Sequence, residues 1–435
     1  MQLNKDNIYF EAQKFIFVNR HQYFIASSLC HSLVRQTNMQ QALLIFLLVI
    51  FGLYILLILY YWQSWLSIPS FKPQLINIAP LTKISVIIPA RNEEENIAAC
   101  LDSITQQRYP KELFEVLVID DHSTDNTAAI VKGYADKNVK LILLKDFVKD
   151  ELNSYKKKAI EIAIAQSTGE LIVTTDADCF VNQHWLQTIA AFYEQYEPAF
   201  IAAPVAILPA PPGEGLGVRF IEFFQGLDFM TLQGITGASV HKKIHSMCNG
   251  ANLAYTKKAF GEVGGFAGID NIASGDDMLL MHKIYKLHPD KVMFLKSEET
   301  IVQTAPVNSV KDFFNQRIRW ASKADKYDDK RIFAVLLLVY MVNVLLLVLP
   351  IMALFLNTQF SIFSFQLSTI EVWIFLLTLK TIVELIFLYP VSKFFGKQQM
   401  LWMFPVMQPF HIIYTVIAGW LGKFGSYKWK GRDVK

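Results

Sequence analysis

The sequence predicts an α/β domain with a mostly parallel sheet, inserted between transmembrane helices. Three observations lead to this prediction. The chain of 435 residues is 53% hydrophobic and only 18% charged, whereas soluble domains average about 25% charged residues. Its apolar residues concentrate in four long runs, one near the N-terminus and three near the C-terminus. The residues between these runs alternate between short β-branched segments and helical periodicity, which is typical of a parallel α/β sheet.

Composition and charge exclude several classes of protein. A formal net charge of +3 does not fit a nucleic-acid binder that relies on a large basic excess, so we expect no nucleic-acid partner. The high apolar content excludes a disordered chain. The four cysteines are scattered and form no C-x-x-C pair, which predicts neither a disulfide framework nor a zinc site.

The first apolar run, residues 42–62, contains no charge and is long enough to cross a hydrocarbon core of about 30 Å. It ends in tyrosine and tryptophan residues of the kind found where lipid meets water. We therefore expect residues 39–71 to form a transmembrane helix and a linker. The run begins too far along the chain, and is too long, for a cleaved signal peptide.

Residues 1–38 form an N-terminal extension of unknown role. Two interpretations stay open for this segment. It is either an extension absent from the native product, whose translation then starts at Met39, or an amphipathic arm on the membrane surface. We assign no function to it.

The second and third apolar runs, residues 332–356 and 370–390, predict two further membrane helices. The third run contains Lys380 and Glu384, which lie four residues apart on one helical face. We expect them to pair inside a helix bundle, because a lone charge in a membrane is costly.

The fourth run, about 400–421, contains Pro405 and Pro409. It forms either a crossing helix or a re-entrant or interfacial segment, and the two prolines favour the second interpretation. We expect residues 332–435 to form a C-terminal membrane region with two to three transmembrane helices and a basic tail.

Residues 72–331 alternate between strands and helices. Short apolar, β-branched runs predict strands at 83–90, 114–121, 139–144 and 171–178. Amphipathic segments predict helices at 92–107, 125–137 and 156–170. Ligands of such a sheet bind beyond the carboxyl ends of its strands.

Two pairs of acids follow predicted strands. Asp176 and Asp178 come at the end of the fourth strand, where two carboxylates one residue apart can converge on Mg²⁺ or Mn²⁺. The alternative is a polar strand end bound only by water and backbone. Asp120 and Asp121 end the second strand, where they can accept hydrogen bonds from a nucleobase or ribose, while the residues after them cap a helix.

Two further segments carry candidate chemistry. Asp276 and Asp277 precede a predicted helix at 278–287, where a carboxylate is ionised, as a general base requires. Plain complementation of the helix dipole is the alternative. In QRIRW, residues 316–320, the side chains either anchor the chain at lipid headgroups or bind a diphosphate and form the floor of an acceptor site.

The segment 220–230, FIEFFQGLDFM, is amphipathic and aromatic. It either lies on the bilayer on the acceptor side or forms a core helix of the domain. The sequence contains no phosphate loop, dinucleotide-binding glycine motif, serine nucleophile elbow or H-E-x-x-H pattern, so those chemistries are disfavoured.

Seven segments of the chain together resemble a known family. They are SVIIPARNEEENI, VLVIDDHSTDNT, KKKAIEIAIAQSTGE, TTDADC, NGANLAYTKKAFGEVGGF, GDDMLL and QRIRW, in this order. This set resembles the family 2 membrane glycosyltransferases, whose GT-A fold is a Rossmann-like, mostly parallel α/β sheet. The resemblance covers about 80–325 and the flanking membrane layout.

The resemblance implies a role for each matching residue. The side that holds the donor nucleotide comprises Pro89, Ala90, Arg91, Glu93, Asp120, Asp121 and Asp176, with Lys156 or Lys157 near the diphosphate. Asp178, with Asp176, would bind Mg²⁺ or Mn²⁺. Asp277 would be the catalytic base, with Asp276 beside it where Glu is more usual in the family.

The acceptor and diphosphate side would include the Q-x-x-R-W motif and the glycine-rich segment. Its residues are Asn249, Gly250, Gln316, Arg317, Arg319 and Trp320. Glu161 and Ala163 depart from the family, which often has Asn and Gly after the lysine, and this weakens the assignment on the phosphate side.

The implied function is that of an inverting glycosyltransferase, which moves a sugar from a nucleotide-sugar, a UDP-sugar, to a polysaccharide or lipid acceptor. Because such donors are cytosolic, residues 72–331 face the cytoplasm of a multi-pass protein in a bacterial-type inner membrane, in contact with membrane lipids. The loop 391–399 carries Lys393 and Lys397 and is then internal, in agreement with the positive-inside rule. The basic tail after the fourth apolar run agrees with the positive-inside rule only if that run does not fully cross the membrane. The alternative function is a non-catalytic membrane scaffold or transporter with an α/β insert, and protein partners are left open.

Overall fold

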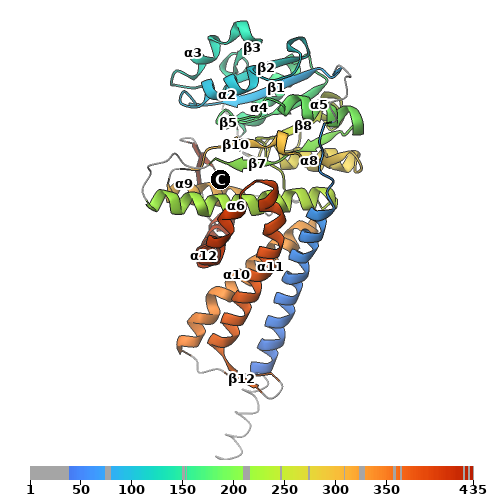
Figure 1. Cartoon of the computed structure of the whole chain (residues 1–435). Coiled ribbons are helices and arrows are strands. Elements are labelled where there is room, and N and C mark those ends of the chain that lie inside the picture. Colours follow the sequence, from blue (N-terminus) through green and yellow to red (C-terminus); the bar gives the residue numbers. More distant parts are fainter. Residues whose placement is uncertain are drawn as a thin grey trace, which may run out of the picture.

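The computed structural model describes residues 39–73, 80–148, 152, 154–208, 216–244, 247–272, 275–307, 309–322, 329–355, 359–362, 365–424, 427–429 and 432–434. An α/β part lies at one end of the molecule and long helices lie at the other (Figure 1). Residues 1–38 lie outside the described residues, so both interpretations of that segment stay open.

The α/β part contains a seven-stranded sheet of order β3-β2-β1-β4-β8-β6-β9. Its first four strands run parallel: β1 (Ile84–Ala90), β2 (Phe114–Asp120), β3 (Val139–Leu143) and β4 (Leu171–Thr174). β8 (Leu253–Thr256) pairs antiparallel with β4 and β6 (Phe200–Ala202), and β9 (Val292–Phe294) runs parallel to β6. The predicted mostly parallel α/β sheet is confirmed.

Helices cover both faces of this sheet. The helices of the α/β part are α2 (Ile97–Thr105), α3 (Thr127–Lys132), α4 (Tyr155–Gln166), α5 (Trp185–Tyr196), α7 (Lys257–Glu262) and α8 (Met278–Leu287). Successive β1 residues enter two different cores. Ile87 packs in the core that includes α4, and Val86 packs in the core that includes α2 and α5. Because both faces are buried, these strands are continuous apolar runs and do not alternate.

Several predicted elements have other bounds in the structure, and the helix predicted at 156–170 already ends at Gln166. The strand predicted at 171–178 ends at Thr174, and the D-A-D segment forms a turn in which the Cys179 N–H donates to the Asp176 carbonyl at 3.2 Å. The helix predicted at 92–107 begins only at Ile97. The helix predicted at 125–137 is interrupted at Gly133, after which a short 3₁₀ turn, η2 (Ala135–Lys137), leads into β3.

The D-A-D turn leads into a second, smaller sheet. β5 (Cys179–Phe180) pairs antiparallel with β10 (Val302–Thr304), which runs parallel to β7 (Val205–Ile207). The 3₁₀ turns η1 (Lys111–Leu113), η3 (Leu144–Asp146) and η4 (Glu298–Thr300) complete the connections.

Two helices, α6 (Leu216–His241) and α9 (Val310–Ala321), lie between the strands and the long helices (Figure 1). α6 packs against β7 and β9 on one side and against a long helix, α11 (Thr369–Phe394), on the other. At Gly234 an added Cβ would lie 2.7 Å from a methyl group of Val391 in α11, so the two helices need glycine there. The amphipathic segment 220–230 therefore belongs to a helix that has strands on one side and a long helix on the other.

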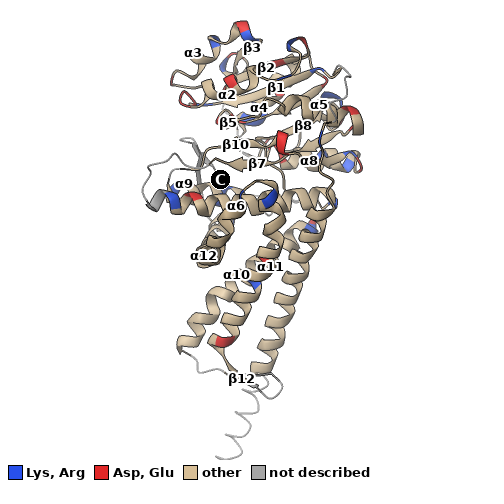
Figure 2. Ribbon diagram, in the orientation of Figure 1, with Lys and Arg blue, Asp and Glu red and all other residues tan. Residues whose placement is uncertain are grey.

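Within the described residues, four helices are long and apolar enough to cross a membrane: Met39–Ser67, α10 (Lys330–Phe355), α11, and Gln398–Phe424, which comprises η5 (Gln398–Met403) and α12 (Phe404–Phe424). Figure 2 shows few charged residues on the first three. This layout indicates membrane association. Lys380 and Glu384 pair as predicted, with 2.8 Å between the ammonium and a carboxylate oxygen. Two hairpins, β11 (Gln359–Ile362) with β12 (Phe365–Ser368) and β13 (Tyr427–Trp429) with β14 (Arg432–Val434), complete the described elements.

The fourth apolar run is not broken at its prolines, because α12 is one continuous helix from Phe404. It packs against α9 and α10 and touches α6. Met400, just before it, packs on Gly226 of α6, and Gly422 near its end packs on Ala321 of α9. Whether this segment crosses a membrane stays a prediction.

Candidate active site

A lysine ammonium joins acids from two distant parts of the chain. Lys156 lies in the first turn of α4, and its Nζ is 2.8 Å from an oxygen of Asp176 and 3.2 Å from an oxygen of Asp276. Burial disfavours the charged ammonium, but the carboxylates of Asp176 and Asp276, together with Asp277, outweigh burial and raise the pKa of Lys156. The acids after β4 and before α8 therefore share one location.

Asp277 is held beside the same group. It caps α8, since its Oδ1 accepts a hydrogen bond from the Met278 N–H at 2.7 Å, and its Oδ2 accepts one from the Gly250 N–H at 3.2 Å. A Cβ on Gly250 would lie 3.4 Å from both the Lys156 Nζ and an oxygen of Asp276. The glycine thus lets the backbone approach the acids closely.

The neighbours of this cluster are held by local contacts. Asn249 closes a turn, because its Oδ1 accepts a hydrogen bond from the Ala251 N–H at 3.0 Å. Asp178, at the end of the D-A-D turn, accepts a hydrogen bond from the Thr304 hydroxyl of β10 at 3.4 Å. Asp176 and Asp178 thus have different partners, one on α4 and one on the smaller sheet.

The ends of β1 and β2 form a second part of the site. The Asp121 N–H donates to the Ala90 carbonyl at 2.8 Å, and the Arg91 guanidinium donates to the Asp121 carbonyl at 2.8 Å. His122 lies 3.0 Å from the Asp121 carboxylate. Asn92 and His122 both have a left-handed backbone, with φ of 52° and 54°. Such strained positions cluster at functional sites.

One carboxylate oxygen of Asp120 is buried and accepts no hydrogen bond from the described residues. The residue is 5% exposed, and its Oδ2 accepts a hydrogen bond from the Ser123 N–H at 3.3 Å. Its Oδ1 is buried and meets no partner among the described residues. A buried carboxylate oxygen without a donor is costly, so this oxygen points to a ligand with an N–H or O–H group.

The other predicted donor-side residues lie at these strand ends. Pro89 pairs in register with Ile119 within the sheet. The Glu93 N–H donates to the Thr127 hydroxyl at 2.8 Å, and a Glu93 carboxylate oxygen accepts from the Asn96 side chain at 3.2 Å. These contacts fix the loop that follows β1 against the start of α3.

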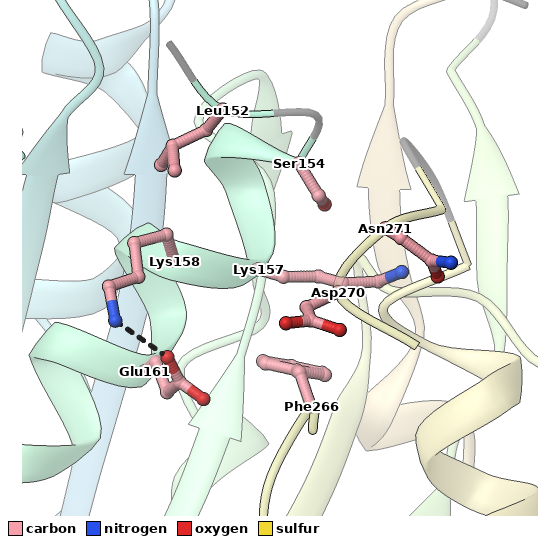
Figure 3. A pocket seen from close by; sticks show the side chains of 8 residues that line it. All are labelled: Leu152, Ser154, Lys157, Lys158, Glu161, Phe266, Asp270 and Asn271. Carbon is pink, nitrogen blue, oxygen red and sulfur yellow. Dashed lines mark hydrogen bonds and ion pairs between the residues drawn. The ribbon is translucent and has the colours of Figure 1, made fainter. Parts of the chain in front are cut away.

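Lys157 points away from the acids. The residue is 1% exposed, and its ammonium donates to the carbonyls of Ile269 and Ile272 at 2.6 and 2.7 Å. It lines a pocket of about 370 Å³ between α4 and the segment before α8, in which Lys158 pairs with Glu161 at 3.1 Å (Figure 3). The other lining residues are Leu152, Ser154, Phe266, Asp270 and Asn271. Of the two lysines that the sequence left open, Lys156 is the one at the acid cluster.

The QRIRW segment lies on α9, and its first arginine is buried. Two nitrogens of Arg317 lie 3.0 and 2.5 Å from one carboxylate oxygen of Asp228 in α6, and both side chains are only 4% exposed. The Arg317 guanidinium also stacks over the rings of Phe313 and Trp320, at 4.6 and 4.2 Å. Gln316 accepts a hydrogen bond from Arg317 at 2.7 Å.

The Arg319 side chain is half-buried and meets no hydrogen-bond or ion-pair partner within the part of the chain that the structure describes, while the Arg319 carbonyl accepts a hydrogen bond from the Ser322 hydroxyl at 2.9 Å. Sequence reasoning missed Asp228 as the partner of Arg317, because the two residues lie on different helices, 89 positions apart. A lone Asp inside an apolar, aromatic helix was the one available signal of a buried pair.

The family model described as Glycosyl transferase family 2 matches residues 85–264. Among its relatives, two examples each match about a quarter of the chain. Glycosyltransferase AglE of Haloferax volcanii is 40% identical over 105 residues, which is 24% of this chain and 33% of that protein. Poly(ribitol-phosphate) beta-N-acetylglucosaminyltransferase TarS of Staphylococcus aureus is 38% identical over 118 residues, which is 27% of this chain and 20% of that protein. The chain thus spans a third or less of the length of these relatives.

Among the solved structures, one example covers most of the chain. The mannosyltransferase PcManGT from Pyrobaculum calidifontis, in complex with GDP-Man and Mn²⁺, matches 86% of this chain and 99% of its own, with a TM-score of 0.52 and 20% identity. At this identity the likeness concerns the fold alone, and it confirms the predicted GT-A fold.

Proposed function

We propose that the chain, whose residues 85–264 match the family model Glycosyl transferase family 2, is an inverting glycosyltransferase acting at the cytoplasmic face of a bacterial-type membrane. It moves a sugar from a nucleotide-sugar, a UDP-sugar, to a lipid or glycan acceptor. The proposed catalytic domain is residues 72–331. The N-acetylglucosaminyltransferase named among the relatives and the mannosyltransferase among the structures support sugar transfer.

One observation carries this proposal. The Lys156 ammonium contacts both Asp176 and Asp276, with Asp277 and Gly250 beside them. The cluster lies beyond the carboxyl end of β4, where a sheet of this kind binds its ligands. A scaffold whose acids only cap helices would have no reason to gather them around a single cation.

The donor nucleotide is proposed to bind at the ends of β1 and β2. The unpartnered oxygen of Asp120 accepts a hydrogen bond from the base or a ribose hydroxyl. Arg91 is already fixed to the Asp121 carbonyl, and it keeps the loops after both strands in place. Lys156 lies on the side of the diphosphate, where its positive charge attracts the phosphate oxygens.

The residues present fit a divalent cation. Among the described residues, no three His, Cys, Asp or Glu side chains form a ready-made metal cluster. Mg²⁺ needs no such cluster, since it binds through one or two carboxylates and completes its shell with phosphate oxygens and water. Asp176 and Asp178 supply hard oxygen ligands of this kind. When bound there, the cation stabilises the negative charge of the leaving nucleoside diphosphate.

Asp277 is proposed as the general base. Two backbone N–H groups fix its carboxylate at the start of α8, which orients it towards the acceptor hydroxyl. Asp277 takes the hydroxyl proton, the hydroxyl oxygen forms a bond to C1 of the sugar, and the bond from C1 to the diphosphate breaks. Attack from the face opposite the leaving group inverts the anomeric configuration.

The experiment measures nucleoside-diphosphate release by the full chain in membranes, with UDP-N-acetylglucosamine, UDP-glucose and GDP-mannose offered in turn with Mn²⁺ or Mg²⁺. We expect release with one of them, its loss in Asp178→Ala, and donor binding without transfer in Asp277→Asn. Asp290→Asn is the matched control, because Asp290 follows the other end of α8 and is 79% exposed. Near-wild-type turnover in Asp277→Asn would overturn the base assignment, and no release from any donor would favour the scaffold or transporter.

A further inference from the structure

We propose that Asp228 and Tyr414 are positioning residues for the acceptor site, which act on Trp320 through Arg317. This inference rests on the proposed function, since it takes Trp320 to be a surface on which the acceptor lies. The three elements involved are α6, α9 and α12, which lie next to one another.

The contacts form a continuous series. The Tyr414 hydroxyl of α12 donates to one carboxylate oxygen of Asp228, and Arg317 donates twice to the other oxygen, at 3.0 and 2.5 Å. The guanidinium then lies 4.2 Å from the centre of the Trp320 ring. Trp320 is therefore held on one face by a cation whose own place is set by α6 and α12.

Aromatic side chains close the surroundings of this ion pair. Phe313 stacks on the guanidinium at 4.6 Å and contacts the ring of Tyr414 at 5.3 Å. Phe224 contacts both of these rings at 5.5 Å. The ion pair thus has little water near it. In such surroundings Arg317 depends on Asp228, because a buried charge without a partner is strongly unfavourable.

Trp320 itself is only partly buried, and its ring lies 6.3 Å from that of Phe229. Phe229 follows Asp228 directly in α6. Two neighbouring residues of α6 therefore act on Trp320: Asp228 holds the Arg317 guanidinium that lies over the ring, and Phe229 contacts the ring itself. A tryptophan ring held in this way presents a rigid apolar surface to a sugar or lipid, at little further entropic cost.

A second buried charge cluster in the same molecule provides the control. The Tyr54 hydroxyl donates to Glu384, which pairs with Lys380, and Gln408 of α12 contacts both charges. Each cluster thus contains a phenol that donates to the carboxylate of a buried ion pair. Among the described residues, Arg317 of α9 belongs to the cluster with Tyr414, and the hydrogen bonds of the cluster with Tyr54 involve no residue of α9.

The deciding experiment follows Trp320 directly. The full chain is labelled with 5-fluorotryptophan in lipid nanodiscs, and the Trp320 signal among the eight tryptophans is assigned by its loss in Trp320→Phe. We expect Tyr414→Phe and Asp228→Asn to shift or broaden this signal, and Tyr54→Phe to leave it unchanged. Tyr414→Phe removes one hydroxyl only, so it keeps the test valid where Asp228→Asn fails to fold. An unchanged Trp320 signal in Tyr414→Phe would overturn the inference.

A turnover measurement separates this inference from the proposed function. With the donor that the wild type uses and octyl β-glucoside as acceptor probe, we expect transfer to fall about tenfold in Tyr414→Phe and further in Asp228→Asn, the size of loss expected when hydrogen bonds to charged groups are removed. The donor KM stays within about twofold of wild type, because the nucleotide site is not changed. Absence of transfer by the wild type would count against the proposed function, and the fluorine signals would still decide on positioning. Equal losses in Tyr54→Phe and Tyr414→Phe would indicate general destabilisation and overturn the inference.

Discussion

Replacement of Lys156 by Met tests the acid cluster, because the ammonium occupies the place that a cation would take. Its Nζ lies 2.8 Å from Asp176, the residue proposed to hold the metal, and 3.2 Å from Asp276. A divalent cation that binds Asp176 must displace this contact. We therefore predict that Lys156→Met binds Mn²⁺ more tightly than wild type and binds the nucleotide-sugar more weakly.

The magnitude follows from the geometry of the displaced contact. At 2.8 Å and an effective dielectric constant of about 20, two opposite charges attract by about 6 kcal/mol, which is a ceiling. The side chains of Lys156 and Asp176 are 23% and 36% exposed, so water weakens the pair. The net value for a hydrogen bond to a charged group, about 1.5–3 kcal/mol, is the better guide. Mn²⁺ should then bind about 10- to 150-fold more tightly to the variant.

The assay is a Mn²⁺ titration of the full chain in nanodiscs, with free Mn²⁺ measured by electron paramagnetic resonance. Lys158→Met is the matched control, because Lys158 lies on the same helix and pairs with Glu161 at 3.1 Å. Without metal, the acids of Lys156→Met lose the charge of the ammonium, so we also expect a lower melting temperature than wild type and a larger rise when Mn²⁺ is added. Equal Mn²⁺ affinities of wild type and Lys156→Met would refute the reasoning, because Asp176 would then not be a metal ligand.

Three other predictions concern the scaffold. Gly169→Ala should destabilise the fold by about 1–3 kcal/mol in thermal unfolding, since its Cβ would lie 2.5 Å from a backbone nitrogen of β1, whereas Gly261→Ala, with open space around it, should not. Burial lowers the pKa of Lys296 to about 8, so the unfolded chain binds more protons between pH 8 and its usual pKa of about 10.4, and wild-type stability should rise with pH in that window. Lys296→Met should flatten that rise, and an equal slope in both proteins would contradict it. A reporter fused after Lys435 should lie in the cytoplasm, and an external reporter would show that the fourth apolar run crosses the membrane.

The elements and the strand-end acids could be predicted because their signals are local. A buried parallel strand is a short apolar run, and the acids of this chain follow such runs directly. The exact end of β4 could not be predicted, because Thr174 and Thr175 fit a strand or a turn equally well. The strand ends at Thr174, and this puts Asp176 in a turn, where its side chain is able to reach Lys156.

The choice between Lys156 and Lys157 depended on the phase of α4. Neighbouring positions on a helix point about 100° apart, so a shift of one residue would exchange their roles. The helix begins at Tyr155 and packs on β1 and β2. This directs Lys156 to the acids and Lys157 to the carbonyls of the segment before α8. The packing of α4 on the sheet decides which of the two lysines faces the acids, and the spacing of residues in the sequence does not predict this packing.

The two prolines of the fourth apolar run predicted a break in the helix, but α12 is continuous through both of them. Pro405 is the second residue of the helix, where a missing N–H costs nothing, and the helix continues through Pro409. Polar contacts hold the helix against α11 and α6: Gln408 binds the Lys380–Glu384 pair of α11, and Tyr414 binds Asp228 of α6. In apolar surroundings these groups would be costly to leave without partners, so their loss, rather than removal of the prolines, is the change that should release α12.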